Sequence, residues 1–241
     1  MIKLIEDNLV QIKANISRSA QRVNRAPEEI TLIAVSKTYP VPDIEKAIQL
    51  GCRDFGENRV QELIAKIEQI NTLVDWHLIG HLQTNKVKYI IGKTKLIHSV
   101  DHLNLAQEIQ KQSIKHNIIT DILLEVNVAR EISKHGLQIE EVMEYVKQIA
   151  QLSHVRVKGL MTVAPYVENP EDNRQIFRQL YDLSVDIQKQ KFNNISTSIL
   201  SMGMSNDYEV AIEEGATMIR IGTSIFGDRN NTYDKKQGGN L

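Results

Sequence analysis

The first residue able to do covalent chemistry is Lys37, which follows an almost uninterrupted apolar run in the stretch LIAVSKTYP. Residues 32–35 have the pattern of a strand that is buried on both faces, as in parallel sheets covered by helices. A lysine at the end of such a strand loses hydration unless it is paired, turned to solvent or held neutral. Because a neutral lysine amine attacks carbonyl carbons, Lys37 is a candidate for Schiff-base chemistry.

Polar and glycine-rich segments stand at the predicted ends of other strands. They are GEN at 56–58, GHLQTNK at 80–86, SMGMS at 201–205 and RIGTSIFG at 220–227. Gly203 and Gly222 permit close approach of backbone N–H groups to an anion such as a phosphate. An amine and a phosphate site on one face suit pyridoxal 5′-phosphate, which carries an aldehyde and a phosphate. They also suit a cofactor-free aldolase acting on a sugar phosphate, and the spacing alone leaves both open.

The histidines and the single cysteine have more ordinary interpretations. His77 and His81 are four residues apart, a spacing that binds zinc when both lie on one helix, but a strand end and Gly80 separate them here. We therefore predict polar packing or a pocket rim for this pair, and no metal site. His98 is expected to be a hydrogen-bonded core histidine, and Cys52 a small buried apolar residue.

The elements that must position these residues alternate along the chain. Apolar residues at positions 5, 9, 12, 16, 20 and 23 predict an amphipathic N-terminal helix that ends near Ala26 and Pro27. About eight short apolar runs follow, separated by helical patterns such as VQELIAKIEQI and IEEVMEYVKQIAQL. This order predicts an α/β protein, a single (β/α)8 TIM barrel with an extra N-terminal helix; a doubly wound open sheet is the alternative. We expect one domain over residues 1–230 and a flexible polar tail over residues 231–241.

The charge of the chain is nearly balanced, since 29 basic and 30 acidic residues give a formal net charge of −1. No whole-chain field therefore draws the protein to nucleic acid or to a membrane surface. Aromatic residues make up 5% of the chain, too few for extended base-stacking platforms. The apolar runs fall short of the roughly 20 residues that span a bilayer. An N-terminus without a signal-like apolar core, and a lone cysteine, predict a cytoplasmic protein.

Eight motifs occur in a fixed order along the chain: IAVSKTYP, FGENRVQE, WHLIGHLQTNK, HSVD, EVNVAREISKHGL, GLMTVAP, LSMGMSND and MIRIGTSIFG. Together they resemble the pyridoxal phosphate homeostasis proteins, the YggS/PROSC family, over roughly residues 1–230. The resemblance implies a barrel similar to the N-terminal domain of alanine racemase. It also implies that pyridoxal 5′-phosphate is held by Lys37 as an internal aldimine. Asn206 stands where an acid is frequent, and Ala129–Arg130 where a small polar or acidic pair is frequent.

The resemblance also assigns roles to residues at the strand ends. The cofactor-binding residues that we expect are Lys37, Asn58, Ser201, Met204, Ser205, Arg220, Gly222 and Thr223. Arg220 is expected at the pyridine nitrogen and Asn58 near the ring or its hydroxyl. The phosphate is expected beside Ser205, Gly222 and Thr223, with a backbone contact from Met204.

The predicted function is to hold, buffer or deliver pyridoxal 5′-phosphate, without substantial substrate turnover. A positive Arg220 beside the pyridine nitrogen opposes its protonation, and an unprotonated ring is a poor electron sink for carbanions. The tyrosine that alanine racemase takes from a separate C-terminal domain has no evident source here. The alternatives are a racemase or lyase that uses the cofactor, and the cofactor-free aldolase. Expected partners are the cofactor and apo forms of enzymes that depend on it, and the protein is expected to be a monomer.

Overall fold

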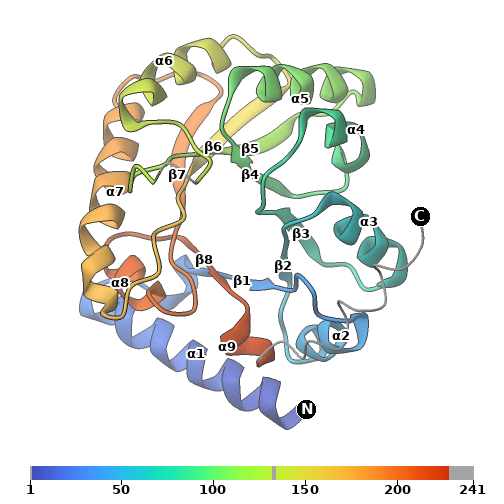
Figure 1. Ribbon diagram of the computed structural model, residues 1–241, viewed down its shortest axis with the longest axis vertical. Helices are drawn as coiled ribbons and strands as arrows, with labels where there is room; N and C mark the ends of the chain where they lie inside the picture. The colour runs from blue at the N-terminus through green and yellow to red at the C-terminus, as the bar shows by residue number, and fades with distance from the viewer. Residues whose placement is uncertain (1, 132–133, 228–241) are drawn as a thin grey trace.

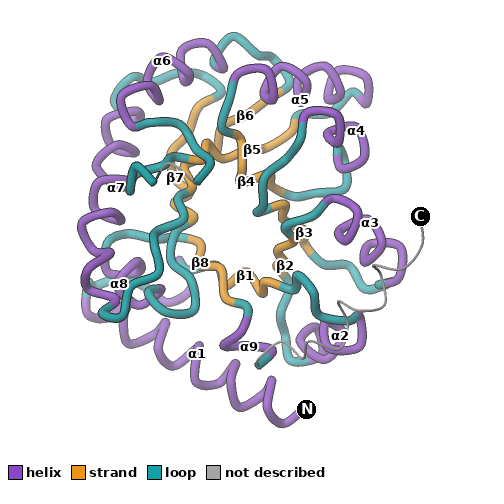
Figure 2. Tube along the Cα trace, in the orientation of Figure 1, coloured by secondary structure: helices purple, strands orange, loops and turns teal. Residues whose placement is uncertain are grey.

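A ring of parallel strands forms the centre of the computed structural model, which describes residues 2–131 and 134–227 (Figures 1 and 2). The strands are β1 (Thr31–Val35), β2 (Asp54–Glu57), β3 (Asp75–Leu78), β4 (Leu96–Val100), β5 (Thr120–Glu125), β6 (Val155–Met161), β7 (Ile195–Ser201) and β8 (Met218–Ile221). They pair in chain order, and β1 pairs with both β2 and β8, so the sheet closes into a barrel. The predicted barrel is confirmed, and the open sheet is excluded. The predicted tail, residues 231–241, lies outside the described residues.

Helices surround the barrel on its outer side (Figure 1). The α-helices are α1 (Ile2–Arg22), α2 (Val41–Gln49), α3 (Val60–Gln69), α4 (Val87–Ile90), α5 (Leu103–His116), α6 (Ile139–Ile149), α7 (Arg174–Gln188), α8 (Tyr208–Glu213) and α9 (Thr223–Phe226). Short 3-10 turns are η1 (Pro27–Glu29), η2 (Thr84–Lys86) and η3 (Pro170–Asn173). Helix α1 precedes β1 and is therefore the extra N-terminal helix.

Helix α1 packs against α8 and α9 through the predicted apolar stripe. Its buried apolar side chains are Ile5, Leu9, Ile12, Ile16 and Ala20. Burying an Ile or Leu side chain contributes roughly 1.5–3 kcal/mol, so this stripe holds the helix on the outer side of the barrel, beside α8 and α9.

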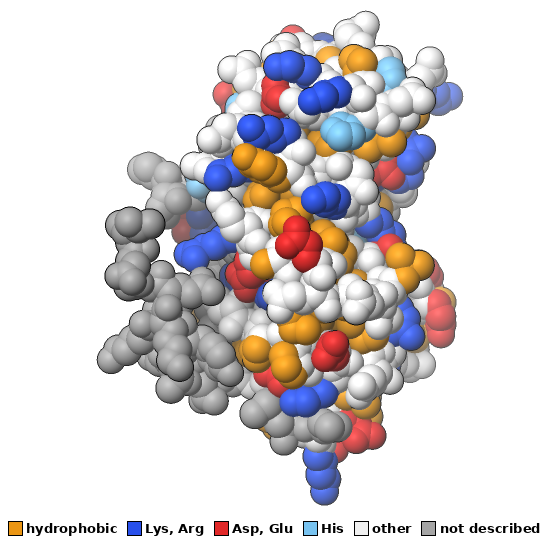
Figure 3. Space-filling model, turned by 90° about the vertical axis from the view of Figure 1, so that its right-hand side faces the viewer, with side chains coloured by type: hydrophobic (Ala, Val, Ile, Leu, Met, Phe, Trp, Pro, Cys, Tyr) orange, Lys and Arg blue, Asp and Glu red, His pale blue; other side chains and the backbone are white. Residues whose placement is uncertain are grey.

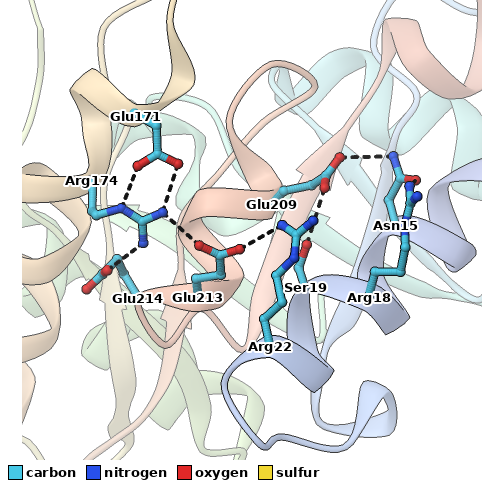
Figure 4. A network of polar contacts seen from close by, with 9 residues as sticks. All are labelled: Asn15, Arg18, Ser19, Arg22, Glu171, Arg174, Glu209, Glu213 and Glu214. Atoms are coloured by element: carbon cyan, nitrogen blue, oxygen red, sulfur yellow. Dashed lines mark hydrogen bonds and ion pairs between the residues drawn. The ribbon is translucent and has the colours of Figure 1, made fainter.

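A polar network fastens α1 to the barrel helices from the solvent side (Figure 4). Glu213 of α8 accepts from Arg22 of α1 at 3.0 Å and from Arg174 of α7 at 2.7 Å. Arg174 also forms a two-fold ion pair with Glu171, and Asn15 donates to Glu209 at 3.0 Å. Because several charges share partners, this network ties three helices together more firmly than isolated surface pairs would.

The apolar core has two parts. Inside the barrel, buried side chains fill the lower layers; these are Ile33, Leu96, Leu123, Met161 and Met218. A larger core fills the space between the strands and the helices, and includes Phe55, Cys52 and Phe177. Burial raises the pKa of the Cys52 thiol to about 11, so the cysteine is protonated at neutral pH, as expected of a packing residue.

The outer surface is mixed in charge on the side that bears α3 and α4. Figure 3 shows Lys and Arg side chains interspersed there with acidic and apolar ones. Within residues 2–131 and 134–227, none of the helices combines the length and the apolar character needed to cross a bilayer.

Candidate functional site

A cavity of about 380 Å³ opens at the carboxyl ends of the strands, and its lining comes from β1 and β8 and from the loops after β1, β2, β3, β6, β7 and β8. Seven of the eight residues predicted for the site line it; these are Lys37, Asn58, Met204, Ser205, Arg220, Gly222 and Thr223. The other lining residues are Val35, Ile79, Val163, Pro165, Tyr166, Asn206 and Asp207. The volume lies in the range of small-molecule sites, and most of the chemistry comes from a few polar groups among apolar walls.

Ser201 is the predicted residue that does not line the cavity. It is fully buried beneath it, at the end of β7. Its hydroxyl accepts a 2.6 Å hydrogen bond from Arg220 Nη1 and lies 3.0 Å from His98 Nδ1. Ser201 therefore contacts the cavity only through Arg220.

Arg220 brings a positive charge to the floor of the cavity although it is only 4% exposed. Its second guanidinium nitrogen, Nη2, donates to the carbonyl oxygen of Thr162 at 2.8 Å. Burial lowers the pKa of Arg220 to about 10, while the nearby carboxyls of Glu125 and Asp207 oppose this shift. The guanidinium remains charged at neutral pH and is held in one orientation by its two bonds.

A chain of buried polar groups continues from Ser201 across the barrel interior. His98 Nε2 lies 3.0 Å from His77 Nδ1, and His77 Nε2 lies 3.0 Å from Asp54 Oδ1. Burial lowers the pKa of His98 well below its ordinary value, and His77 and Arg220 lower it further. His77 and His98 are thus hydrogen-bonded core residues as predicted, while His81 lies outside the core on the loop after β3.

Lys37 is carried by a loop that a buried ion cluster holds in place. Lys66 Nζ donates to the carbonyl oxygen of Ser36 and to Glu57 Oε1, both at 2.7 Å. It also donates to Glu62 Oε1 at 2.6 Å. Burial raises the pKa of Glu57, and the neighbouring charge of Lys66 opposes the rise. These contacts fix the residue immediately before Lys37 from below.

The residue after Lys37 is fixed as well. Thr38 has a φ of 69°, which is uncommon for a β-branched residue, and its N–H donates to Glu62 Oε1 at 2.6 Å. This support was not predicted from the sequence. The sequence feature that could have predicted it is the four-residue spacing of Glu62 and Lys66, which places two opposite charges on one face of α3.

The loop after β7 is folded around Asp207, another residue that the sequence analysis missed. Asp207 Oδ1 accepts from the Met204 N–H at 2.7 Å, and Asp207 Oδ2 accepts from Asn173 Nδ2 at 2.8 Å. Gly203 has a φ of 89°, and a Cβ there would lie 2.6 Å from the Cβ of Ala211. Glycine is therefore required at 203, and Asp207 aims the Met204–Ser205 segment at the cavity.

Two hydroxyls meet at the rim between the loops that follow β7 and β8. Thr223 Oγ1 lies 3.4 Å from Ser205 Oγ. Gly222 and Thr223 begin the short helix α9, whose first N–H groups have no acceptor within the helix. This part of the cavity offers hydrogen-bond donors. Among the described residues that line it, Asp207 is the one carboxylate, and it is already bonded to Met204 and Asn173.

Comparisons with known proteins agree with this geometry. The family model for the alanine racemase N-terminal domain matches residues 8–230. A pyridoxal phosphate homeostasis protein of Aquifex aeolicus (strain VF5) is 47% identical over 224 residues, which cover 92% of this chain and 97% of that protein. The structure of PipY of Synechococcus elongatus PCC7942 with PLP bound has a TM-score of 0.81 at 33% identity, covering 92% of this chain and 100% of that one.

An alanine racemase of Clostridium difficile 630 shares the fold alone, with a TM-score of 0.73 and 16% identity. The match covers 94% of this chain and 57% of the racemase. The resemblance seen in the eight motifs is confirmed by the family model and by the Aquifex relative. The chain belongs to the family of pyridoxal phosphate homeostasis proteins, built on the alanine racemase N-terminal domain.

Proposed function

We propose that this protein binds pyridoxal 5′-phosphate in the cavity and buffers or delivers it, as a homeostasis protein without substantial substrate turnover. One observation carries the proposal: a single cavity joins the amine of Lys37, the buried guanidinium of Arg220 and the hydroxyls of Ser205 and Thr223. The name of the Aquifex relative and the PLP bound to PipY support it.

The residues present suit the chemical groups of this cofactor. Bound pyridoxal phosphate supplies an aldehyde for covalent attachment, and a ring that stabilises carbanions well only when its nitrogen is protonated. Lys37 offers the amine for attachment at one wall of the cavity. Ser205, Gly222 and Thr223 provide hydroxyl and N–H donors for the phosphate. The N–H of Met204, expected to contact the phosphate, donates instead to Asp207 Oδ1. Asn58 is placed for the ring or its hydroxyl.

Asn58 owes its position to Gly80 on the next loop. A Cβ at Gly80 would lie 2.5 Å from the carbonyl oxygen of Asn58 and 2.8 Å from its Cβ. The two loops can approach this closely only because residue 80 has no side chain. We therefore assign Gly80 the task of letting Asn58 reach the cavity wall.

Arg220 favours a carrier over an enzyme. Facing the ring nitrogen, a guanidinium that stays charged disfavours a second positive charge there. Its bonds to Ser201 and Thr162 prevent it from turning away. Ser201, predicted as a direct contact, is assigned the indirect task of holding Arg220.

The alternative, an amino-acid racemase or lyase, would need a second acid or base beside the cavity. Tyr166 borders the cavity, but its side chain is 84% exposed. Proton transfer by a group so open to water would be poorly shielded from solvent. We therefore favour the carrier, acting as a monomer in the cytoplasm and supplying apo forms of enzymes that depend on the cofactor.

Borohydride reduction tests the site and the function together. Protein purified with pyridoxal phosphate should show an absorption band of the attached cofactor, and reduction followed by peptide mapping should place the pyridoxyl group on Lys37. Lys37→Ala should abolish the adduct. The control is Lys134→Ala, which removes a half-buried lysine on another loop and should leave the adduct on Lys37 unchanged. An adduct on Lys134 or Lys86 would contradict the assignment.

Enzyme and carrier are separated by deuterium exchange at the α-carbon of alanine. The loaded wild-type protein should show little exchange and no racemisation. Exchange coupled to racemisation, and lost in Tyr166→Phe, would establish the racemase instead. Transfer of the cofactor to an apo-enzyme, faster than its release into buffer, would support delivery by direct contact.

A further inference from the structure

Three histidines gather around one carboxylate on the half of the barrel mouth away from the cavity. His81 follows β3, Asp101 and His102 follow β4, and His135 lies on the loop between β5 and α6. None of the four lines the proposed cofactor cavity. Because they come from three consecutive loops, the barrel itself brings them together.

Three of these side chains direct one ligand atom each toward a common region. His81 Nδ1 lies 3.7 Å from Asp101 Oδ2, and His135 Nδ1 lies 3.8 Å from the same oxygen. The three ligand atoms all lie within 4.8 Å of one another. The two imidazole rings are stacked, with centroids 4.0 Å apart and an angle of 13° between their planes.

These separations are too long for hydrogen bonds, which join nitrogen and oxygen at about 2.7–3.2 Å. They are close to the spacing of ligands around a metal ion. Ligand atoms about 2.0–2.1 Å from a tetrahedral zinc ion lie about 3.3 Å from one another. The two distances to Asp101 would have to shorten by about half an ångström. The stacked rings of His81 and His135 would also have to turn out of their nearly parallel arrangement, so that the lone pairs of both Nδ1 atoms point at one ion.

His102 orients the carboxylate of Asp101. His102 Nδ1 lies 2.6 Å from the other oxygen of Asp101, Oδ1, and the Asp101 side chain is only 9% exposed. Oδ2 is thereby left facing the two histidines. Such outer contacts orient the ligands of metal sites and increase their affinity.

We propose that His81, Asp101 and His135 bind a divalent transition-metal ion, with Zn²⁺ as the reference probe. Two imidazoles and one carboxylate suit zinc and its neighbours better than they suit Mg²⁺ or Ca²⁺, which prefer oxygen ligands. Three protein ligands leave coordination positions for water. A bound ion would link the loops after β3, β4 and β5 and stiffen one half of the barrel mouth.

The proposal is independent of the cofactor and is tested by metal binding alone. Metal-stripped protein should bind one Zn²⁺ per chain in calorimetric titration, and Co²⁺ should give a visible absorption spectrum. The protein is titrated without the cofactor, because the phenolic oxygen and phosphate of pyridoxal phosphate can themselves bind metal ions. His81→Ala and His135→Ala should each weaken binding at least about tenfold and remove the Co²⁺ spectrum. His102→Ala should weaken it by about 10- to 100-fold.

The matched control is His116→Ala, which removes an exposed histidine at the end of α5. Its affinity for Zn²⁺ should equal that of the wild type. His81 and His135 are exposed, so their variants should fold, which thermal melting followed by circular dichroism would verify. Absence of stoichiometric binding to the wild type, or equal binding by His135→Ala and the wild type, would overturn the proposal. Loss of binding in His116→Ala would overturn it too.

Discussion

Arg220 Nη1 donates a 2.6 Å hydrogen bond to Ser201 Oγ inside the barrel. A guanidinium has no acceptor, so the serine hydroxyl must accept this bond and is left with its own proton to donate. The remaining partner in reach is His98 Nδ1, at 3.0 Å. In the series of hydrogen bonds that starts at Arg220, each group therefore donates to the next group farther from the cavity.

The hydrogen bonds of Asp54, at the other end of this series, require the same direction of donation. Burial alone would raise the pKa of Asp54, but hydrogen bonds from His77 and Lys95 outweigh it and hold the pKa below its ordinary value. The ionised carboxylate can only accept, so His77 Nε2 carries a proton and His77 Nδ1 accepts from His98 Nε2. Two neutral histidines thus connect the positive Arg220 to the negative Asp54, with every bond satisfied.

The first prediction concerns the tautomers of these histidines. In ¹⁵N spectra, both His77 and His98 should carry their proton on Nε2 only, at pH 7. His98 should remain neutral well below the ordinary range of a histidine pKa, because burial and the positive charge of Arg220 oppose a second proton. Finding the proton on His98 Nδ1 would reverse the direction of the chain and contradict the assignment.

Ser201→Ala should destabilise the protein, because it removes the acceptor of a buried charged donor. The expected loss in the free energy of unfolding is about 1.5–3 kcal/mol, measured by urea denaturation. Ser198→Ala, on the same strand but exposed, is the matched control and should change stability by less than about 0.5 kcal/mol. Equal effects of the two substitutions would show that Ser201 does not hold Arg220.

Lys66→Met should be among the most destabilising single substitutions near the site. It leaves the buried carboxylate of Glu57 and the half-buried carboxylate of Glu62 without their shared cation. Breaking a buried ion pair in this way costs about 3–5 kcal/mol of unfolding free energy. The control is Lys189→Met, whose ion pair with Asp186 is exposed and should contribute about 1 kcal/mol or less.

The Lys66 variant also tests whether the cluster positions Lys37. If it does, borohydride trapping of pyridoxal on Lys37 should be slower in folded Lys66→Met than in the wild type. An unchanged trapping rate in the folded variant would limit the cluster to a structural task.

The fold could be predicted from the sequence because its signals are local. The strands β1 and β8 appear as short apolar runs, and α1 appears as a stripe with helical spacing. Strand ends were predicted less accurately: the sequence has an apolar run DILLEVNV at residues 121–128, but β5 ends at Glu125. Beyond that point only Val126 forms an isolated bridge, to Leu137, so the apolar residues there pack without extending the strand.

The site was predictable where a residue stands at a strand end, and less so where contacts cross the barrel. Lys37 and Arg220 lie at the cavity as expected. Ser201 does not, because its side chain is fully buried in the barrel interior beneath the guanidinium of Arg220, which lines the cavity. The contact of His77 with His98 depends on the register of β3 and β4, which no local pattern specifies.

Glu125 should make stability fall as pH rises. Burial, reinforced by Asp101, raises the pKa of this carboxyl to about 7, and Arg220 only partly opposes the shift. The folded state therefore binds a proton more tightly than the unfolded state, whose carboxyl titrates near 4.5. The stabilisation is complete below about pH 4.5 and is lost between that pH and 7.

Glu125→Gln removes this dependence, so the stability of the variant relative to the wild type should increase by about 3 kcal/mol from pH 4.5 to pH 8. Unfolding is measured in EDTA so that no metal alters Asp101. Glu171→Gln is the control: its hydrogen bond with Arg174 lowers the pKa of that carboxyl, so its effect should be nearly constant above pH 5. A constant difference for Glu125→Gln as well would contradict the raised pKa.

Thr223→Val should separate recognition of the phosphate from recognition of the ring. Valine keeps the volume of threonine but removes the hydroxyl that lies 3.4 Å from Ser205 Oγ at the rim of the cavity. A hydrogen bond to a charged group contributes about 1.5–3 kcal/mol, so the affinity for pyridoxal phosphate should fall by about tenfold to a hundredfold. Affinity for pyridoxal, which has no phosphate, should stay the same. Ser224→Ala changes the neighbouring residue outside the cavity and should affect neither ligand. Equal losses for both ligands would place the phosphate elsewhere.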